Sequence, residues 1–141
     1  MQQEFLVLDA NILIRAVLGP KVRNILLNFN DRVTFLVPDI CLTDAKKYLP
    51  LIFEKRKLPY EPAVAILTNL KNLVQIIDKT VYQEQATEAK KRIELRDPQD
   101  WPIVATALTF NCPVWTEDQD FFGSGLSIWT TDRIHLFFEN L

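Results

Sequence analysis

The sequence contains little cysteine, histidine or glycine, and these shortages exclude several kinds of protein. Its two cysteines, Cys41 and Cys112, each lie inside an apolar segment, and we expect two free thiols in a reducing, cytoplasmic compartment rather than a disulfide. The single histidine, His135, leaves no Cys/His set for zinc, and we expect it to be structural or solvent-facing. With three glycines in all, the chain shows no repeat, linker or low-complexity segment.

Long apolar runs and an excess of positive charge are also missing. The longest apolar runs, such as Pro102–Phe110, are too short to span a bilayer, and the N-terminal MQQEFLVLD has no basic region of the signal-peptide type. We therefore expect no membrane contact. Because 16 Lys and Arg stand against 18 Asp and Glu, the net charge is −2, and contact with a polyanion requires a local basic patch or a metal.

The length and composition fit one globular domain, which we place at residues 1–141. A hydrophobic share of 48% and a charged share of 24% exclude an intrinsically disordered chain. Short apolar runs without strict alternation occur between longer stretches of helical spacing, which is typical of an α/β fold around a parallel sheet. The five expected strands are Glu4–Leu8, Val33–Val37, Val74–Ile77, Cys112–Thr116 and Leu126–Trp129.

Helical spacing occupies the segments around these strands. We expect Pro50 to kink or stop a helix that begins at Asp39, and Thr80 to cap one long helix that ends near Glu94. Asp97-Pro98 then separates that helix from the next one. The other expected helices are Asn11–Val17, Lys21–Phe29, Asp100–Thr109, Thr131–Glu139 and one over approximately residues 60–73.

Aspartates follow two of the predicted strands directly. Asp9 comes immediately after the first strand, and Asp118 and Asp120 follow the fourth, while Asp44 lies on the helix after the second strand and Asp100 opens the helix that leads to the fourth. In parallel α/β sheets, ligands bind beyond the carboxyl ends of the strands. Carboxylates that converge there repel one another, and a hard divalent cation relieves this repulsion. Oxygen ligands favour Mg²⁺ or Mn²⁺ over zinc.

Each of these acids also has a simpler structural explanation. Asp9, Asp97 and Asp100 are placed to cap helices, and Asp39 has the pattern of an ordinary N-cap. Asp118 and Asp120 could be loop acids in a turn. The repeated placement of an acid directly after an apolar strand favours a common site over a set of independent caps.

Three segments carry a family resemblance that covers nearly the whole chain. Val7–Leu13 (VLDANIL) resembles the opening motif of PIN domains, in which a strand is followed by Asp-x-Asn and an apolar helix. Asp97–Leu108 (DPQDWPIVATAL) resembles the central motif of that family, and Val114–Phe121 (VWTEDQDF) is similar to its closing motif. The three motifs occur in the family's order and spacing.

The resemblance implies a three-layer α/β/α fold with a five-stranded parallel sheet in the order 3-2-1-4-5. It also implies an Mg²⁺- or Mn²⁺-dependent ribonuclease, most often the VapC-like toxin of a type II toxin–antitoxin pair. The implied partners are an RNA substrate, an antitoxin protein and a second copy of the chain in a homodimer. The apolar helix around Cys41–Phe53 is the expected dimer contact.

Carried over position by position, the resemblance assigns roles to individual residues. The implied catalytic acids are Asp9, Asp44, Asp100 and Asp118, and the implied metal ligands are Asp9, Asp100, Asp118 and the additional acid Asp120. The family usually has a glutamate where this chain has Asp44, so the carboxylate of Asp44 is one methylene further from the metal. Asn11 and Thr116 would hold the acids in orientation.

RNA contact would come from basic side chains near the acids. The candidates are Arg15, Lys46, Lys47 and Arg96, each of which is equally compatible with a solvated helix face. Two other protein classes stay open. A catalytically weak PIN-like protein-binding module is favoured by Asp44, and a response-regulator phosphoacceptor domain is disfavoured because no lysine follows Arg96.

Overall fold

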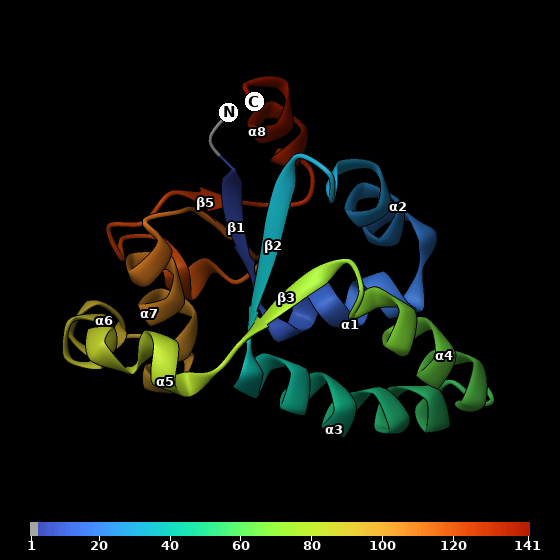
Figure 1. The fold of residues 1–141 in the computed structure, drawn as a ribbon. Helices are drawn as coiled ribbons and strands as arrows, with labels where there is room; N and C mark the ends of the chain where they lie inside the picture. Colours follow the sequence, from blue (N-terminus) through green and yellow to red (C-terminus); the bar gives the residue numbers. More distant parts are fainter. Residues whose placement is uncertain (1–2) are drawn as a thin grey trace.

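A five-stranded parallel sheet lies at the centre of the computed structural model, which describes residues 3–141 (Figure 1). The strand order is β3-β2-β1-β4-β5, as the family resemblance implied. Strands β4 and β5 are shorter than predicted, because two residues of each pair with a neighbour. The strand bounds are β1 Glu4–Leu8, β2 Val33–Pro38, β3 Val74–Ile77, β4 Val114–Trp115 and β5 Ile128–Trp129.

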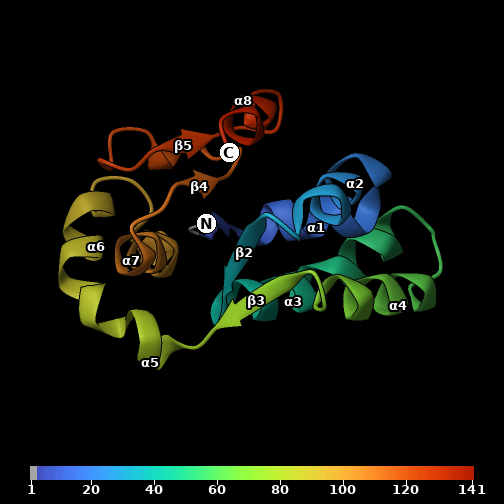
Figure 2. The ribbon, with the colours of Figure 1, turned by 45° about the horizontal axis from the view of Figure 1, so that its top comes forward.

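Helices cover both faces of the sheet and complete three layers. Figures 1 and 2 show α1 to α4 on one side and α5 to α7 on the other, with α8 at the end of the sheet opposite α3 and α5. The chain leaves β1 toward β2 and later returns to its other side as β4, so the strand order reverses between β1 and β4. The helix bounds are α1 Ala10–Leu18, α2 Pro20–Phe29, α3 Asp39–Lys55, α4 Glu61–Leu70, α5 Lys79–Tyr82, α6 Ala86–Ile93, α7 Trp101–Phe110 and α8 Ile134–Glu139. Among the described residues, no helix combines the length and the apolarity needed to cross a membrane.

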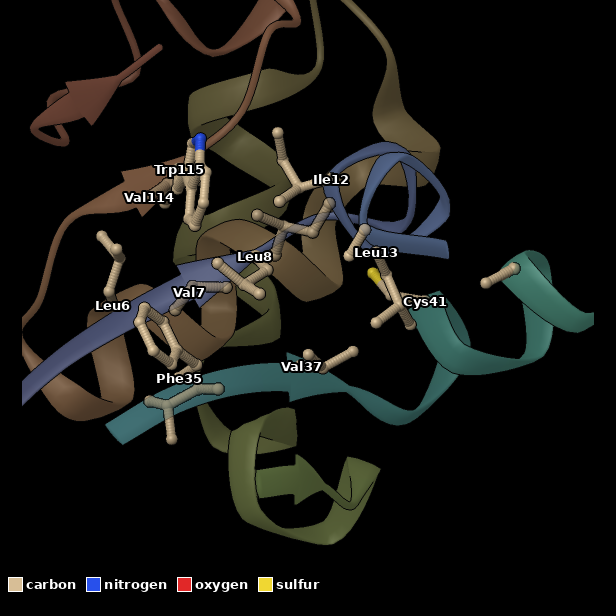
Figure 3. Packing of buried hydrophobic residues seen from close by; sticks show 14 of the residues in the cluster. Leu6, Val7, Leu8, Ile12, Leu13, Phe35, Val37, Cys41, Val114 and Trp115 are labelled. Atoms are coloured by element: carbon tan, nitrogen blue, oxygen red, sulfur yellow. The ribbon is translucent and has the colours of Figure 1, made fainter. Parts of the chain in front are cut away.

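The central strand β1 is buried on both faces, which explains its unbroken apolar run. Leu6, Val7 and Leu8 are completely buried. Figure 3 shows them between Phe35 of β2 and Trp115 of β4, which also have no exposed surface. At about 25 cal/mol per Å² of apolar surface, burial of these side chains is the main source of stability at the strand whose end carries Asp9. Both cysteines are free, as predicted.

Helix α7 lies close to the sheet because its middle consists of small and apolar residues. Ala105, Thr106 and Ala107 are at most 1% exposed, and the Thr106 hydroxyl donates to the Pro102 carbonyl within the helix. The helix ends at Asn111, whose left-handed backbone conformation suits an asparagine. Its first residue follows Asp100 directly, so the packing of α7 fixes the position of that aspartate.

A stop at Pro50, one of the two outcomes expected there, is wrong, because α3 continues through the proline to Lys55. The proline removes one amide donor to the carbonyl of Lys46, which is an exposed residue whose carbonyl water can reach. The helix therefore continues past the proline, and its outer face stays regular.

The predicted long helix from Thr80 to Glu94 is divided. Asp78, rather than Thr80, caps it: the Asp78 carboxylate accepts from the Thr80 amide at 3.0 Å and from the Thr80 hydroxyl at 2.6 Å. After Tyr82 the α-helix is replaced by a 3-10 turn. The ring of Tyr82 is buried, and its hydroxyl donates to Asp39 at 2.7 Å. This anchor separates α5 from α6.

Candidate metal centre

Asp9 stands where β1 ends and α1 begins, and it is 6% exposed. Its Oδ1 accepts from the Ile12 amide at 2.9 Å, so it caps α1 as the structural explanation predicted. Its Oδ2 accepts from the Thr116 hydroxyl. The cap holds the carboxylate at the carboxyl end of β1, which is where the metal-site hypothesis requires it.

Thr116 joins the ends of the two neighbouring strands. It follows Trp115, which pairs with Leu8, so Thr116 and Asp9 occupy the next positions on adjacent strands. The Thr116 hydroxyl donates to Asp9 and accepts from the Asp118 amide at 3.0 Å. One buried threonine thus fixes the side chain of Asp9 and the backbone of Asp118.

A cavity of about 360 Å³ lies beyond these strand ends. Five aspartates contribute to its wall: Asp9, Asp44, Asp97, Asp100 and Asp118. The three acids predicted as the principal metal ligands therefore line one cavity, and Asp44 of α3 joins them, but among the described residues the acids whose oxygens come within 4.8 Å of one another are Asp97, Asp100 and Asp120. Asn11, Cys41 and Tyr48 also line the cavity.

Asp100 has a carboxylate oxygen without a partner. Its Oδ2 is buried and accepts no hydrogen bond from any residue that the structure describes. Carboxylate oxygens of Asp97, Asp100 and Asp120 also lie within 4.8 Å of one another, so Asp100 belongs both to the cavity and to this second group. A buried acceptor without a donor is costly, and a cation would satisfy it.

Asp97 is a cavity residue that the sequence analysis assigned to capping first. It does cap, because its Oδ1 accepts from the Gln99 amide at 3.0 Å. The turn Pro98–Asp100 is a 3-10 helix, in which residues three apart lie on the same side, and this brings Asp97 next to Asp100. The signal was the Asp-Pro-x-Asp spacing, in which proline favours the start of a helical turn.

Burial and mutual repulsion raise the pKa values of two acids. Burial chiefly raises the pKa of Asp9 from 3.8 to about 6, against the hydrogen bonds from Thr116 and Ile12, which lower it. Burial also raises the pKa of Asp100 to about 7, and the charges of Asp97 and Asp118 add to this effect. Two carboxyls whose pKa values lie above that of a free aspartate are expected of a cation site considered without its cation.

The donor set suits a hard divalent cation. The described ligand atoms are carboxylate oxygens, and the nearby sulfur, that of Cys41, belongs to a buried thiol whose pKa is raised by burial and by Asp9 and Asp44. Such a thiol stays protonated and is a poor metal ligand. Oxygen donors with an unpartnered carboxylate oxygen fit Mg²⁺ or Mn²⁺.

The predicted basic residues are distributed unequally around this centre. Arg15 lines an adjoining cavity of about 840 Å³, which shares Asn11 with the acidic cavity and is also bordered by Lys55 and Arg56. Lys46 and Lys47 do not line the acidic cavity. Lys46 lies near Lys71, whose pKa it lowers, and the Lys47 ammonium lies 5.4 Å from the Tyr48 ring centre. Arg96 lies beside Gly123 instead.

Comparisons with known proteins agree with this architecture. A family model described as "PIN domain" matches residues 7–139. A search of curated proteins found no match. The chain is similar in structure to PAE2754 from Pyrobaculum aerophilum, with a TM-score of 0.67 and 15% identity over 99% of this chain and 91% of that one.

Two similar structures come from complexes bound to DNA. DNA-bound VapBC from Salmonella typhimurium gives a TM-score of 0.66 and 18% identity over 92% of this chain and 99% of the other. VapBC2 from Rickettsia felis, bound to a promoter fragment, gives a TM-score of 0.63 and 21% identity over 89% and 98%. With the family match over residues 7–139, the sheet order and the acids at the strand ends, this chain belongs to the PIN domain family.

Proposed function

We propose that this chain is an Mg²⁺- or Mn²⁺-dependent endoribonuclease that acts as the toxin of a type II toxin–antitoxin pair. The observation that carries the proposal is the buried, unpartnered Oδ2 of Asp100 within a cavity lined by five aspartates. Membership of the PIN domain family supports nuclease chemistry, and solved toxin–antitoxin complexes share the fold.

The acids would act as ligands rather than as proton carriers. Asp9, Asp100 and Asp118 would hold the cation, with Asp97 and Asp120 beside Asp100 as further carboxylates. The cation would neutralise charge on the scissile phosphate and lower the pKa of a water molecule for hydrolysis. No histidine is then needed to carry a proton, and the one histidine of the chain, His135, is exposed on α8 and does not line the cavity.

Thr116 would position the acids through its hydrogen bonds to Asp9 and to the Asp118 amide. Because Thr116 bonds both the Asp9 carboxylate and the Asp118 amide, the Asp9 carboxylate and the Asp118 backbone cannot move apart without breaking its bonds. The Ile12 amide holds the other oxygen of Asp9. A ligand set held in this way loses little conformational freedom when a cation binds.

The RNA would be held by charge next to the acidic cavity. The cavity that contains Arg15, Lys55 and Arg56 joins the acidic cavity at Asn11, so a phosphate chain in one continues into the other. Metal-free carboxylates would repel that chain. We therefore expect that the cation is required both for binding of RNA and for its cleavage.

Partner binding would use the outer face of α3. Leu51 is 55% exposed on this helix, and Ile40 and Tyr48, which also line the acidic cavity, are 42% and 46% exposed, so a partner on this face would lie next to that cavity. We propose that this face contributes to a homodimer and that an antitoxin binds nearby. Solved structures of similar fold include a toxin–antitoxin complex from Klebsiella pneumoniae and VapBC from Salmonella typhimurium.

The deciding experiment is cleavage of a fluorescent single-stranded RNA with and without Mg²⁺. We expect cleavage by the wild type, complete loss in a chelator, and a fall of at least about a hundredfold in Asp9→Asn. Asp31→Asn is the matched control, since Asp31 is an exposed acid after α2 outside the cavity. Equal cleavage by the wild type and Asp9→Asn would refute the proposal.

The same experiment separates the catalytically weak binding module from the enzyme. The substitution of Asp44 for the usual glutamate favoured that alternative, yet Asp44 lines the acidic cavity together with Asp9 and Asp100. Asp44→Glu lengthens the side chain, and Asp44→Ala removes the carboxylate. An enzyme that uses Asp44 loses activity in Asp44→Ala, whereas a binding module shows no metal-dependent cleavage in any form.

A further inference from the structure

A second cavity adjoins the acidic one on the side away from Arg15. It has a volume of about 610 Å³ and shares Ile40, Gln99 and Pro102 with the acidic cavity. Its own wall is formed by Lys79 and Tyr82 of α5 and by Trp101 of α7. Trp101 directly follows the candidate ligand Asp100 in the chain. The two cavities are therefore neighbours both in space and in sequence.

The indole ring of Trp101 is half-buried and lies among cations. The ammonium of Lys90 is 4.9 Å from the ring centre, and that of Lys79 is 6.0 Å from it. Tyr82 supports the ring edge to face, with 5.6 Å between ring centres. An aromatic surface with nearby ammonium groups combines the two features that bind single-stranded nucleic acid, stacking of bases and attraction of phosphates.

The wall of this cavity is held rigid by Asp39. Its Oδ1 accepts from the Ile40 amide at 2.8 Å and from the Tyr82 hydroxyl, and its Oδ2 accepts from the Lys79 amide at 3.1 Å. The carboxylate is thus occupied by three donors of the wall itself. Lys79 and Lys90 remain exposed, and neither lies within 4.0 Å of a carboxylate among the described residues.

We propose that this cavity binds one nucleotide of the RNA beside the scissile phosphate, with the base stacked on Trp101 and a phosphate near Lys79. The proposal rests on the ribonuclease function proposed above. The RNA would cross from the Arg15 cavity, over the acids, to Trp101. Since stacking uses the flat face that every base has, we expect this position to accept any base.

Binding is tested first without cleavage, by titration of the ¹⁵N-labelled protein with adenosine 5′-monophosphate. We expect the indole N–H signal of Trp101 to shift, and the signal of the completely buried Trp115 to stay in place. Lys79→Gln should weaken the titration, and Lys91→Gln, on the exposed side of α6, is the matched control. A Trp101 signal that does not respond at millimolar nucleotide would overturn the proposal.

Cleavage kinetics give the second test. In a 12-nucleotide single-stranded RNA, Trp101→Leu should raise KM at least about fivefold with kcat nearly unchanged, and Trp101→Phe should restore most of the loss. An abasic nucleotide at the stacked position should impair the wild type and have no further effect on Trp101→Leu. Equal KM values for the wild type and Trp101→Leu would contradict the pocket.

The two proposals fail in different ways. A wild type that cleaves no RNA, while the Trp101 signal still shifts with nucleotide, removes the ribonuclease function and keeps the nucleotide pocket. If the abasic nucleotide impairs cleavage by the wild type and by Trp101→Leu equally, the ribonuclease function stands and the nucleotide pocket is refuted. If Trp101→Leu loses binding to a protein partner while its KM for RNA stays unchanged, the cavity belongs to that partner and the proposal is overturned.

Discussion

Replacement of Asp9 by asparagine should stabilise the metal-free protein, and the gain should grow with pH. The folded pKa of Asp9 is about 6, against 3.8 for a free aspartate. Because burial raises this pKa, folding favours the protonated acid. The stability contributed by protonation is fully present below pH 3.8 and is lost as the pH rises through about 6.

The size of the effect follows from the difference between the two pKa values. At 1.36 kcal/mol per pKa unit, ionisation of Asp9 should lower the free energy of unfolding by about 3 kcal/mol between pH 4 and pH 8. Asparagine resembles the protonated acid: its oxygen accepts from the Ile12 amide, and its amide can donate to Thr116. Asp9→Asn should therefore match the wild type near pH 4 and exceed it by up to about 3 kcal/mol at pH 8.

Urea unfolding in a chelator at several pH values measures this difference. Asp100 titrates in both proteins, and its pKa is lower in Asp9→Asn because the charge of Asp9 contributes to raising it, so the difference reports Asp9 together with this coupling. Asp31→Asn should follow the wild type at every pH. A constant difference between Asp9→Asn and the wild type from pH 4 to pH 8 would refute the reasoning, because it would mean that Asp9 is equally ionised in the folded and unfolded chains.

Three further perturbations have defined outcomes. Mg²⁺ at a hundred times its dissociation constant should raise the unfolding free energy of the wild type by about 2.7 kcal/mol and that of Asp9→Asn by much less, as urea unfolding at pH 8 will show. Thr116→Val should reduce Mg²⁺ affinity about 10- to 100-fold, measured by calorimetry, whereas Thr116→Ser should retain most of it. Sedimentation should give a dimer of the 16.4 kDa chain, and Leu51→Lys should give a monomer. Leu95→Lys, at a site 92% exposed in the turn after α6, should leave the dimer intact, and a monomeric wild type would contradict the dimer contact on α3.

The acids after the strands could be predicted because a parallel sheet imposes their position. Whatever follows β1 and β4 must lie at the same edge, so Asp9 and Asp118 converge once the strands are identified. Asp97 was assigned to capping first because a cap and a cation ligand have the same local sequence pattern. Only the 3-10 turn between Asp97 and Asp100 shows that one residue can serve both purposes.

Features that depend on distant contacts could not be predicted from local patterns. The division of the Thr80–Glu94 segment results from Tyr82, whose hydroxyl reaches Asp39, 43 residues earlier in the chain. The position of Lys79 and Lys90 near Trp101 likewise depends on how α5 and α6 pack against α7. The order of charged and aromatic residues along the sequence does not indicate that Lys79, Lys90 and Trp101 lie close together.

The bond from Thr116 to Asp9 makes the site sensitive to the alignment of two strands. Side chains of a strand alternate between its two faces, so a one-residue slip of β4 against β1 would turn the threonine hydroxyl away and place a neighbour of different shape beside Asp9. The paired part of β4 is two residues long, and its alignment is specified by pairing with both β1 and β5 and by the completely buried Trp115. Insertion or deletion of a residue between α7 and β4 should thus impair cation binding and stability together.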